Sequence, residues 1–174
     1  FPYTTLFRSF EYGCFCPVMR LHGYRWPLQP QYGTTGGATC VSGAPNEVWS
    51  YTDQVCEILS DYLRLRERML PYITELMEEA HEKGTPVMRP LFYDFPEDKE
   101  SWNVETEYMF GPKVLVKPIT DADARETDVY LPGGASWTNA WTGETFEGGQ
   151  KVHVAAPIEQ IPLFTRDGYK LPMK

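Results

Sequence analysis

The residue types that could do chemistry in this chain are concentrated in the stretch GCFCPVMRLHG, residues 13–23. Cys14 and Cys16 are separated by one residue, and Arg20 and His22 follow within six positions of the second cysteine. Such a set could bind a metal ion, carry out redox or nucleophilic chemistry, or line the wall of a substrate pocket. Other features of the sequence have to separate these possibilities.

The spacing of the two cysteines argues against a metal centre. Structural zinc sites usually place two to four residues between paired cysteines and take a second ligand pair from elsewhere in the chain. Only one residue separates Cys14 from Cys16, and no second cysteine or histidine pair has a suitable spacing. Residues two apart share one face of a strand, but free cysteines are commonly buried as small apolar side chains. We therefore expect strand packing here, with neither a metal nor another cofactor.

Two possibilities remain: nucleophilic catalysis by a cysteine and a histidine, or substrate binding by Arg20 and His22. A reactive thiolate needs an adjacent base and electropositive surroundings, whereas Pro17 stands between Cys16 and His22 and no third orienting residue is evident. If residues 13–19 form a β/α-barrel strand, Arg20 and His22 follow its carboxyl end, where barrel active sites lie. They would then contact substrate. An ion-paired arginine and a buried histidine are the alternative, and spacing alone does not choose between them.

Composition excludes several classes of partner. The 174 residues are 42% hydrophobic and carry a net charge of −8, which argues against binding to nucleic acid or to an anionic membrane. No apolar run approaches the roughly 20 residues of a membrane span. No signal peptide is visible. The cysteines are too few for a disulfide framework, so a cytoplasmic location is expected; they are Cys14, Cys16, Cys40 and Cys56.

Helices are predicted only towards the end of the first half, between residues 55 and 84. Residues 13–19 are an apolar run typical of a buried strand, and residues 24–45 are a Gly-, Pro- and Thr-rich loop. One helical stripe then follows at three- and four-residue steps, made of Val55, Ile58, Leu59, Tyr62, Leu65 and Met69. Most of the intervening RLRER is predicted to face solvent. Pro71 should kink or restart the helix, a second stripe holds Ile73, Leu76, Met77 and Ala80, and Gly84 is the predicted C-terminal cap.

After residue 84 the pattern changes to short β-like runs. They are VMRPLFYDF, YMFGPKVLVKPI, TDVYLP, KVHVAAP and IPLFTR, separated by turn sequences such as LPGGAS and EGGQ. Several short strands at this spacing predict an antiparallel β-sandwich. Acidic residues fall in stretches that look solvated, and none ends a buried strand. A set of aromatic residues could stack on sugars or fill the sandwich core: Trp102, Trp137, Trp141, Tyr108 and Phe110.

These stretches together resemble one enzyme family. FEYGCFCPVMRLHG, PNEVWSY, YLRLRERMLPYITELMEEAHEKGTPVMRPLFYDFP, YMFGPKVLVKPI, VYLPGG, WTGETFEGG and IPLFTRDG occur in that order. They are similar to the C-terminal stretch of glycoside hydrolase family 31, the retaining α-glucosidases and α-xylosidases. The resemblance implies that residues 10–84 are the end of a truncated (β/α)8 barrel and residues 85–174 a proximal C-terminal β-sandwich. It assigns His22 to hydroxyls of the sugar in the −1 subsite and gives Arg20 a supporting role at the pocket wall.

The resemblance also implies what this chain does and does not do. Residues 1–9 match the translation of a sequencing-adapter oligonucleotide, show no helical or strand period, and are set aside. Retaining hydrolysis needs two carboxyl groups about 5 Å apart, and the family's two catalytic aspartates belong to earlier barrel strands. We therefore expect this chain to be part of an α-glycosidase that acts on α-linked glucosides or xylosides, with α-linked oligosaccharide as its substrate. The chain alone is expected to be inactive. The sequence does not predict an oligomeric state. A non-catalytic carbohydrate-binding β-sandwich and a metal or redox module are the alternatives. Only residues 85–174 are expected to have a complete core.

Overall fold

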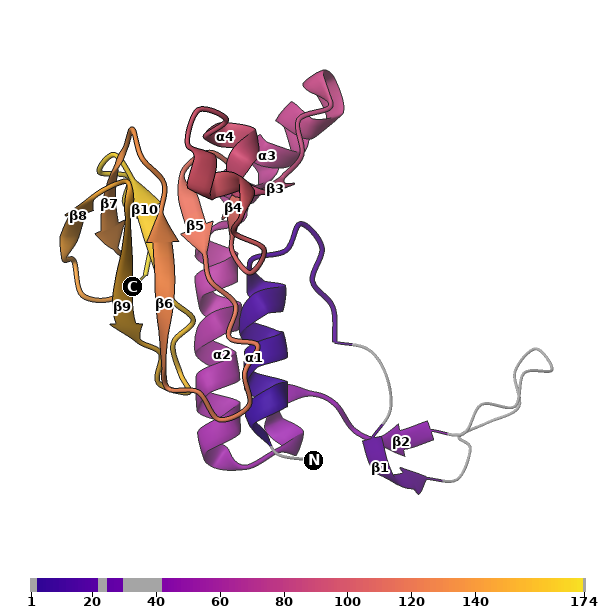
Figure 1. Cartoon of the computed structure of the whole chain (residues 1–174). Helices are drawn as coiled ribbons and strands as arrows, with labels where there is room; N and C mark the ends of the chain where they lie inside the picture. The colour runs from indigo at the N-terminus through magenta and orange to yellow at the C-terminus, as the bar shows by residue number, and fades with distance from the viewer. Residues whose placement is uncertain (1–2, 22–24, 30–41, 174) are drawn as a thin grey trace.

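A helical layer and an antiparallel β structure make up the molecule. The computed structural model describes residues 3–21, 25–29 and 42–173. The helical elements are α1 (Tyr3–Cys14), η1 (Val48–Ser50), α2 (Asp53–Arg68), α3 (Leu70–Lys83), α4 (Leu91–Asp94) and η2 (Lys99–Trp102). Figure 1 shows α1 and α2 side by side, with α3 continuing from α2. No helix among the described residues is both long and apolar enough to cross a membrane.

The predicted helices over residues 53–83 are confirmed. The stripe side chains at Val55, Leu59 and Leu65 are buried in the core. The Thr52 side chain caps the start of α2 by accepting a hydrogen bond from the backbone N–H of Val55 at 3.4 Å. Pro71 lies in the first turn of α3, and Gly84 ends it in the left-handed conformation at φ +70°. The Pro71 restart and the Gly84 cap therefore both occur as expected.

The strands pair in antiparallel fashion throughout, as the turn-rich second half predicts. β1 (Arg25–Gln29) pairs with β2 (Ser42–Ala44), although residues 24–45 are predicted to be a loop. A six-stranded sheet has the order β3-β4-β5-β10-β7-β8, and β6 pairs with β9 in a separate two-stranded sheet. These elements are β3 (Met88–Arg89), β4 (Tyr108–Phe110), β5 (Val114–Val116), β6 (Glu126–Leu131), β7 (Ser136–Asn139), β8 (Thr145–Glu147), β9 (Gln150–Ala155) and β10 (Leu163–Arg166).

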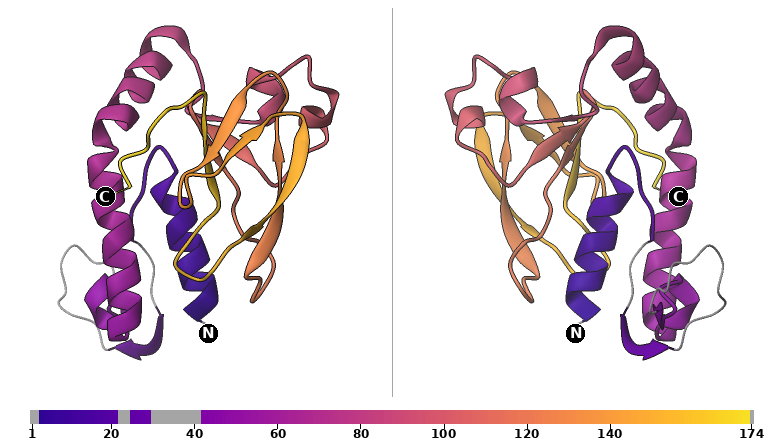
Figure 2. Two further views of the ribbon diagram at one scale, coloured as in Figure 1. Left: turned by 90° about the vertical axis from the view of Figure 1, so that its left-hand side faces the viewer. Right: turned by 90° about the vertical axis from the view of Figure 1, so that its right-hand side faces the viewer.

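The six-stranded sheet is buried on both faces. In β5, Val114 and Val116 belong to a core shared with the helices, whereas Leu115 belongs to a second core shared with β6. Because side chains alternate between the faces of a strand, the continuous apolar run VLV supplies both cores. Figure 2 shows the resulting layers, with the helices on one side of the sheet and the β6–β9 pair on the other.

The expectation that residues 85–174 have a complete core of their own is wrong. One face of the sheet is covered by α1, α2 and α3, and the same cluster includes Phe10 and Leu76 from the helices with Phe110 and Leu163 from the sheet. The second core alone is built within residues 85–174. The helical layer therefore shields one face of the sheet from water.

Two further expectations are wrong near the start of the chain. Residues 13–14 end α1 and residues 15–18 form a turn and bends, so the predicted strand over 13–19 is absent. A strand needs a neighbour for its backbone groups, and among the described residues none pairs with this segment. Residues 3–9, predicted to lack any period, open α1 with Phe7 and Arg8 buried. That residues 1–9 derive from an adapter stays a prediction.

Candidate functional site

The two residues predicted to contact substrate, Arg20 and His22, follow the α1 sequence. Arg20 is exposed to solvent at the end of the segment that follows the helix. His22 lies outside the described residues. What the structure does show is how the chain leading to them is held.

Four successive carbonyl groups ahead of Arg20 are bound by side chains from elsewhere in the fold. Arg66 on α2 donates from Nη1 to the carbonyl oxygens of Cys14 at 2.7 Å and Cys16 at 2.8 Å, and from Nη2 to that of Pro17 at 3.0 Å. The Tyr108 hydroxyl on β4 donates to the carbonyl oxygen of Phe15 at 2.9 Å. Hydrogen bonds from a charged donor are stronger than neutral ones, so α2 and β4 together fix the course of residues 14–17.

Sequence reasoning missed Arg66 because it placed RLRER on the solvent face. Arg64 is indeed exposed and pairs with Asp61 at 2.7 Å. Arg66 instead reaches the α1 end, and Arg68 donates to the carbonyl oxygens of Pro172 at 2.8 Å and Met173 at 2.9 Å. Backbone carbonyls carry no sequence signature, so no pattern in the sequence could have identified these acceptors.

Replacing Arg66 with methionine should loosen the segment that carries Arg20. The amides of Phe15 and Cys16 bond to Tyr12 and Gly13 in the last turn of α1, and that turn loses its anchor with the guanidinium. Since a bond from a charged group contributes about 1.5–3 kcal/mol, hydrogen exchange at these two amides should quicken by roughly tenfold or more. Amides of β6 and β9 should be unaffected.

The matched control for that experiment is Arg64→Met, which removes an exposed arginine two residues away on the same helix. Equal exchange at Phe15 and Cys16 in wild type and Arg66→Met would show that the three carbonyl contacts do not hold the segment.

The cysteines next to this segment are packing residues. Cys14 is fully buried, its thiol donates to the carbonyl oxygen of Tyr62 at 3.3 Å, and burial raises the pKa of the thiol to about 12. Cys16 is half-buried with its thiol 3.4 Å from the Tyr12 carbonyl oxygen. A thiol with a raised pKa is a poor nucleophile and metal ligand. Across residues 3–21, 25–29 and 42–173, no group of three or more His, Cys, Asp or Glu side chains is placed to hold a metal ion.

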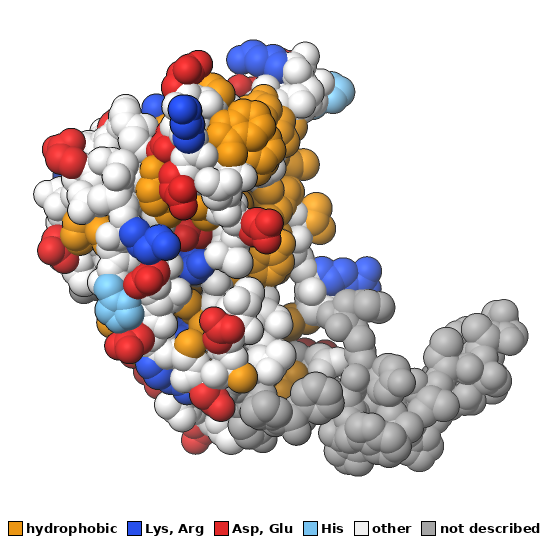
Figure 3. All heavy atoms as spheres, viewed as in Figure 1, with side chains coloured by type: hydrophobic (Ala, Val, Ile, Leu, Met, Phe, Trp, Pro, Cys, Tyr) orange, Lys and Arg blue, Asp and Glu red, His pale blue; other side chains and the backbone are white. Residues whose placement is uncertain are grey.

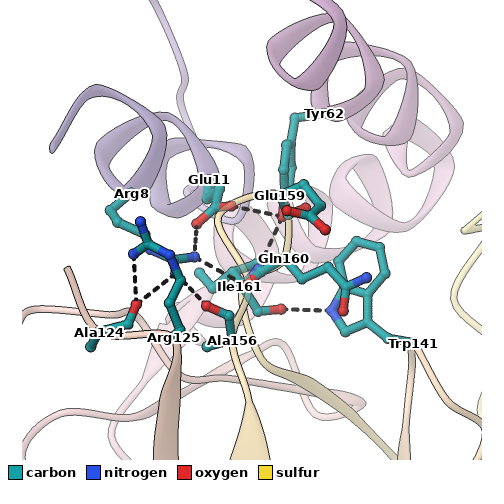
Figure 4. A network of polar contacts seen from close by, with 10 residues as sticks. All are labelled: Arg8, Glu11, Tyr62, Ala124, Arg125, Trp141, Ala156, Glu159, Gln160 and Ile161. Carbon is teal, nitrogen blue, oxygen red and sulfur yellow. Dashed lines mark hydrogen bonds and ion pairs between the residues drawn. The ribbon is translucent and has the colours of Figure 1, made fainter. Parts of the chain in front are cut away.

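A buried polar network joins the helices to the β structure (Figure 4). Arg8 on α1 pairs with Glu11 at 2.9 Å and donates to three carbonyl oxygens of the second half, on Gln160 at 3.1 Å, Ala124 at 3.2 Å and Ala156 at 2.6 Å. The Tyr62 hydroxyl on α2 lies 3.2 Å from the other Glu11 oxygen. Three segments far apart in the sequence therefore converge on one ion pair.

The Tyr62 hydroxyl completes this network on its other side. It accepts a hydrogen bond from the N–H of Ile161 at 3.0 Å and lies 3.1 Å from the carbonyl oxygen of Glu159. The Trp141 indole donates to the Ile161 carbonyl oxygen at 2.7 Å. Burial raises the pKa of Glu11 to about 7, against the opposing effects of the Arg8 guanidinium and the Tyr62 hydroxyl. Setting residues 1–9 aside hid this network, because its central cation is Arg8.

A second buried carboxyl group, Glu107, borders a hollow of about 640 Å³ between α1 and the loop 118–123. Its two oxygens accept from the backbone N–H of Tyr130 at 3.0 and 3.2 Å, and Lys117 lies 3.7 Å away. Burial raises the pKa of Glu107 to about 7. The carboxylate oxygens of Glu11 and Glu107 are thus all engaged in hydrogen bonds within the protein. Neither carboxylate is free to attack a substrate.

The five aromatic residues suggested for sugar stacking differ in how far they are buried. Trp137 and Phe110 are fully buried, so the core interpretation holds for them. Tyr108 and Trp141 are partly buried and donate to backbone carbonyls. Trp102 alone of the five is largely exposed, at 58%.

Comparison with known proteins covers nearly the whole chain. The model of the glycosyl hydrolase family 31 C-terminal domain matches residues 84–171, and that of the glycosyl hydrolases family 31 TIM-barrel domain matches residues 2–76. An α-xylosidase of Saccharolobus solfataricus is 36% identical over 95% of this chain and 20% of its own length. α-Glucosidase 2 of Bacillus thermoamyloliquefaciens is 35% identical over 94% of this chain and 19% of its own.

Solved structures give the same result. The crystal structure of a GH31 α-xylosidase from a soil metagenome, complexed with xylose, superposes with a TM-score of 0.90 at 45% identity, covering 97% of this chain and 25% of that one. The chain spans about a fifth of the length of the curated relatives described above.

Proposed function

Since this chain belongs to glycosyl hydrolase family 31, we propose that it is the C-terminal part of a retaining α-glycosidase that hydrolyses α-linked xylosides or glucosides. The observation that carries the proposal is the likeness to the xylose-bound α-xylosidase, which extends over 97% of the chain at a TM-score of 0.90. On this proposal residues 10–84 are the end of a truncated (β/α)8 barrel and residues 85–174 the proximal C-terminal domain. A cytoplasmic location belongs to the same proposal, in keeping with the free thiols of Cys14, Cys16 and Cys56.

Arg20 and His22 contribute one wall of the sugar pocket in this proposal. A neutral sugar offers hydroxyl groups, and an imidazole and a guanidinium can both donate hydrogen bonds to them. Support comes from the segment just before Arg20, where Arg66 and Tyr108 bind four successive carbonyls. Productive binding requires groups held within a fraction of an ångström, and this anchoring provides such a support.

We also propose that the chain alone does not hydrolyse glycosides. Retaining chemistry needs a nucleophile and an acid/base carboxyl about 5 Å apart. Among the described residues, the two carboxyls whose pKa burial raises to about 7 are Glu11 and Glu107, and both are engaged with neighbouring groups. The family resemblance places both catalytic aspartates on barrel strands ahead of the matched segment.

A chimaera tests the proposed role of the pocket residues. Residues 10–172 would replace the corresponding segment of the Saccharolobus α-xylosidase, whose own catalytic region stays in place. We expect the chimaera to hydrolyse an aryl α-xyloside, and His22→Ala to lower kcat/KM by about 100-fold, since a lost contact to the reacting sugar costs roughly 2.7 kcal/mol. Arg20→Ala should cause a smaller loss.

The isolated 174-residue chain serves as the companion measurement, and it should show no turnover of aryl α-xyloside or aryl α-glucoside above background. Turnover by the isolated chain that disappears on substituting one of its own acidic residues would overturn the proposal. A His22→Ala chimaera with unchanged kcat/KM would remove His22 from the site while leaving the family assignment intact.

A further inference from the structure

Two exposed aromatic rings form a stacked pair at the surface of the α4–η2 region. The Phe92 and Trp102 rings are nearly parallel, with centroids 4.6 Å apart and an interplanar angle of 13°. Trp102 is 58% exposed, and the neighbouring Tyr93 is 46% exposed. Figure 3 shows hydrophobic side chains gathered at the surface over α4. The Phe92 ring therefore covers one face of the Trp102 indole.

The Trp102 indole is also held at its edge. Its Nε1 donates to the carbonyl oxygen of Pro96 at 3.0 Å. The η2 turn that carries it begins at Asp98, whose carboxylate accepts from the backbone N–H groups of Glu100 at 3.1 Å and Gly133 at 2.7 Å. The same carboxylate accepts from the Tyr130 hydroxyl at 2.7 Å, so η2 is tied to β6. These contacts give the exposed indole face a fixed orientation before any ligand arrives.

Two exposed polar side chains belong to the same turn as Trp102. Asn103 follows Trp102, and its Nδ2 donates to Glu100 Oε2 at 3.3 Å, with both side chains exposed. An amide and a carboxylate offer both donors and acceptors to hydroxyl groups. Small-molecule sites usually combine aromatic side chains with a few polar groups that fix the orientation of the ligand.

The size of the patch favours a small ligand over a protein. Aromatic side chains bury 150–250 Å² each, so the exposed parts of Phe92, Tyr93 and Trp102 amount to roughly 300 Å². A stable protein interface needs about 800 Å² from each partner. Glu97, Lys99 and Glu100, which are close to Trp102 in the sequence, are exposed as well. One sugar ring, by contrast, matches the face of an indole in area.

We propose that Trp102, backed by Phe92, is a surface binding site for a neutral α-linked oligosaccharide. One pyranose ring would lay its C–H face on the indole, and its hydroxyls would bond to Asn103 and Glu100. The class of saccharide rests on the proposed function, because the enzyme's own substrate would supply it. The site itself rests on the geometry of the α4–η2 region.

The test is an NMR titration of the 15N-labelled chain with maltohexaose, isomaltohexaose and a xyloglucan heptasaccharide. The five tryptophans give separate indole N–H signals, and Trp102→Phe assigns the one of interest. We expect a saturable shift of the Trp102 signal with at least one sugar and a Kd on the order of 1 mM. Trp102→Ala has no indole signal at this position, so its binding is followed at the backbone N–H signals of residues 99–103. It should bind at least tenfold more weakly than wild type, and Phe92→Ala severalfold more weakly.

The matched control is Trp49→Ala, because Trp49 on η1 is 73% exposed and makes no ring contact within the described part of the chain. It should leave binding unchanged. Absence of any shift, or equal affinity of wild type and Trp102→Ala measured at the backbone N–H signals of residues 99–103, would overturn the proposal. So would concentration-dependent shifts of these backbone signals without sugar that vanish in Trp102→Ala, since they would make the patch a contact between copies of the chain. Binding is measured without turnover, so failure of the chimaera to hydrolyse leaves this result unaffected.

Discussion

Replacing Arg8 with methionine should lower the free energy of unfolding by about 3–5 kcal/mol, the usual cost of removing one partner from a buried ion pair. Arg8 is buried and binds Glu11 together with the carbonyl oxygens of Ala124, Ala156 and Gln160. Methionine fills much of the volume but donates nothing, so these acceptors lose their partner away from water. Urea-induced unfolding followed by circular dichroism measures the change.

The pH dependence of this loss identifies the contribution of the ion pair. The pKa of Glu11 in the folded state is about 7, above its ordinary 4.5. The folded state therefore holds this proton more tightly, so the stability gained from protonation is complete below pH 4.5 and is lost as pH rises towards 7. Without the guanidinium the pKa of Glu11 rises further, and the loss continues above pH 7. The deficit of Arg8→Met should be larger at pH 8 than at pH 5.

Arg64→Met is the matched control, because it removes an exposed arginine whose pair with Asp61 is also exposed. Its effect should stay within about 0.5 kcal/mol, as for most surface ion pairs. If Arg8→Met lost the same stability at pH 5 and pH 8, the Arg8–Glu11 charge interaction would contribute nothing beyond the carbonyl contacts.

Gly111→Ala should be similarly damaging, at about 3–5 kcal/mol, from two sources of roughly 1–3 kcal/mol each. Gly111 has φ +60°, a conformation that residues with a Cβ rarely adopt. An added Cβ would lie 2.5 Å from Leu76 Cδ2 and would also collide with the Tyr72 hydroxyl. That hydroxyl donates to the Phe110 carbonyl oxygen at 2.8 Å, so it is not free to move aside. Thermal unfolding of the purified variant measures the effect.

Gly84→Ala separates the two sources, since Gly84 has φ +70° but nothing within 4 Å of an added Cβ. It should cost only about 1 kcal/mol, the backbone contribution alone. Comparable losses in the two variants would mean that α3 shifts away from Gly111 at little cost, contrary to tight packing between α3 and the sheet.

Local features of the sequence were sufficient for α2 and α3, although they missed α1, β1 and β2. The apolar stripe at Val55, Leu59 and Leu65, with Pro71 and Gly84 as boundaries, predicted α2 and α3 because each signal acts within a few residues. The VLV segment lies in a run predicted to be β-like, and it forms β5, which is buried on both faces. The run at 13–19 failed, because an apolar stretch becomes a strand only when another strand lies beside it.

The contacts around the candidate site could not be predicted in the same way. Arg66 and Arg8 bind main-chain carbonyls that are distant in sequence, such as those of Cys14 and Ala156. Every residue has a carbonyl group, so composition and spacing cannot show which one an arginine will reach. Arg20 and His22 were candidates because they follow an apolar run, and the family resemblance assigned their role, which stays a prediction.

The double-sided burial of the central sheet has a consequence for how pieces of such enzymes can be exchanged. Val114, Val116 and Leu163 face helices that come earlier in the chain. A cut near residue 84 would leave those side chains without cover, even though the two family models divide there. The transplantable module is therefore the sheet together with α1, α2 and α3, and recombination between homologues should preserve that whole unit rather than the β half alone.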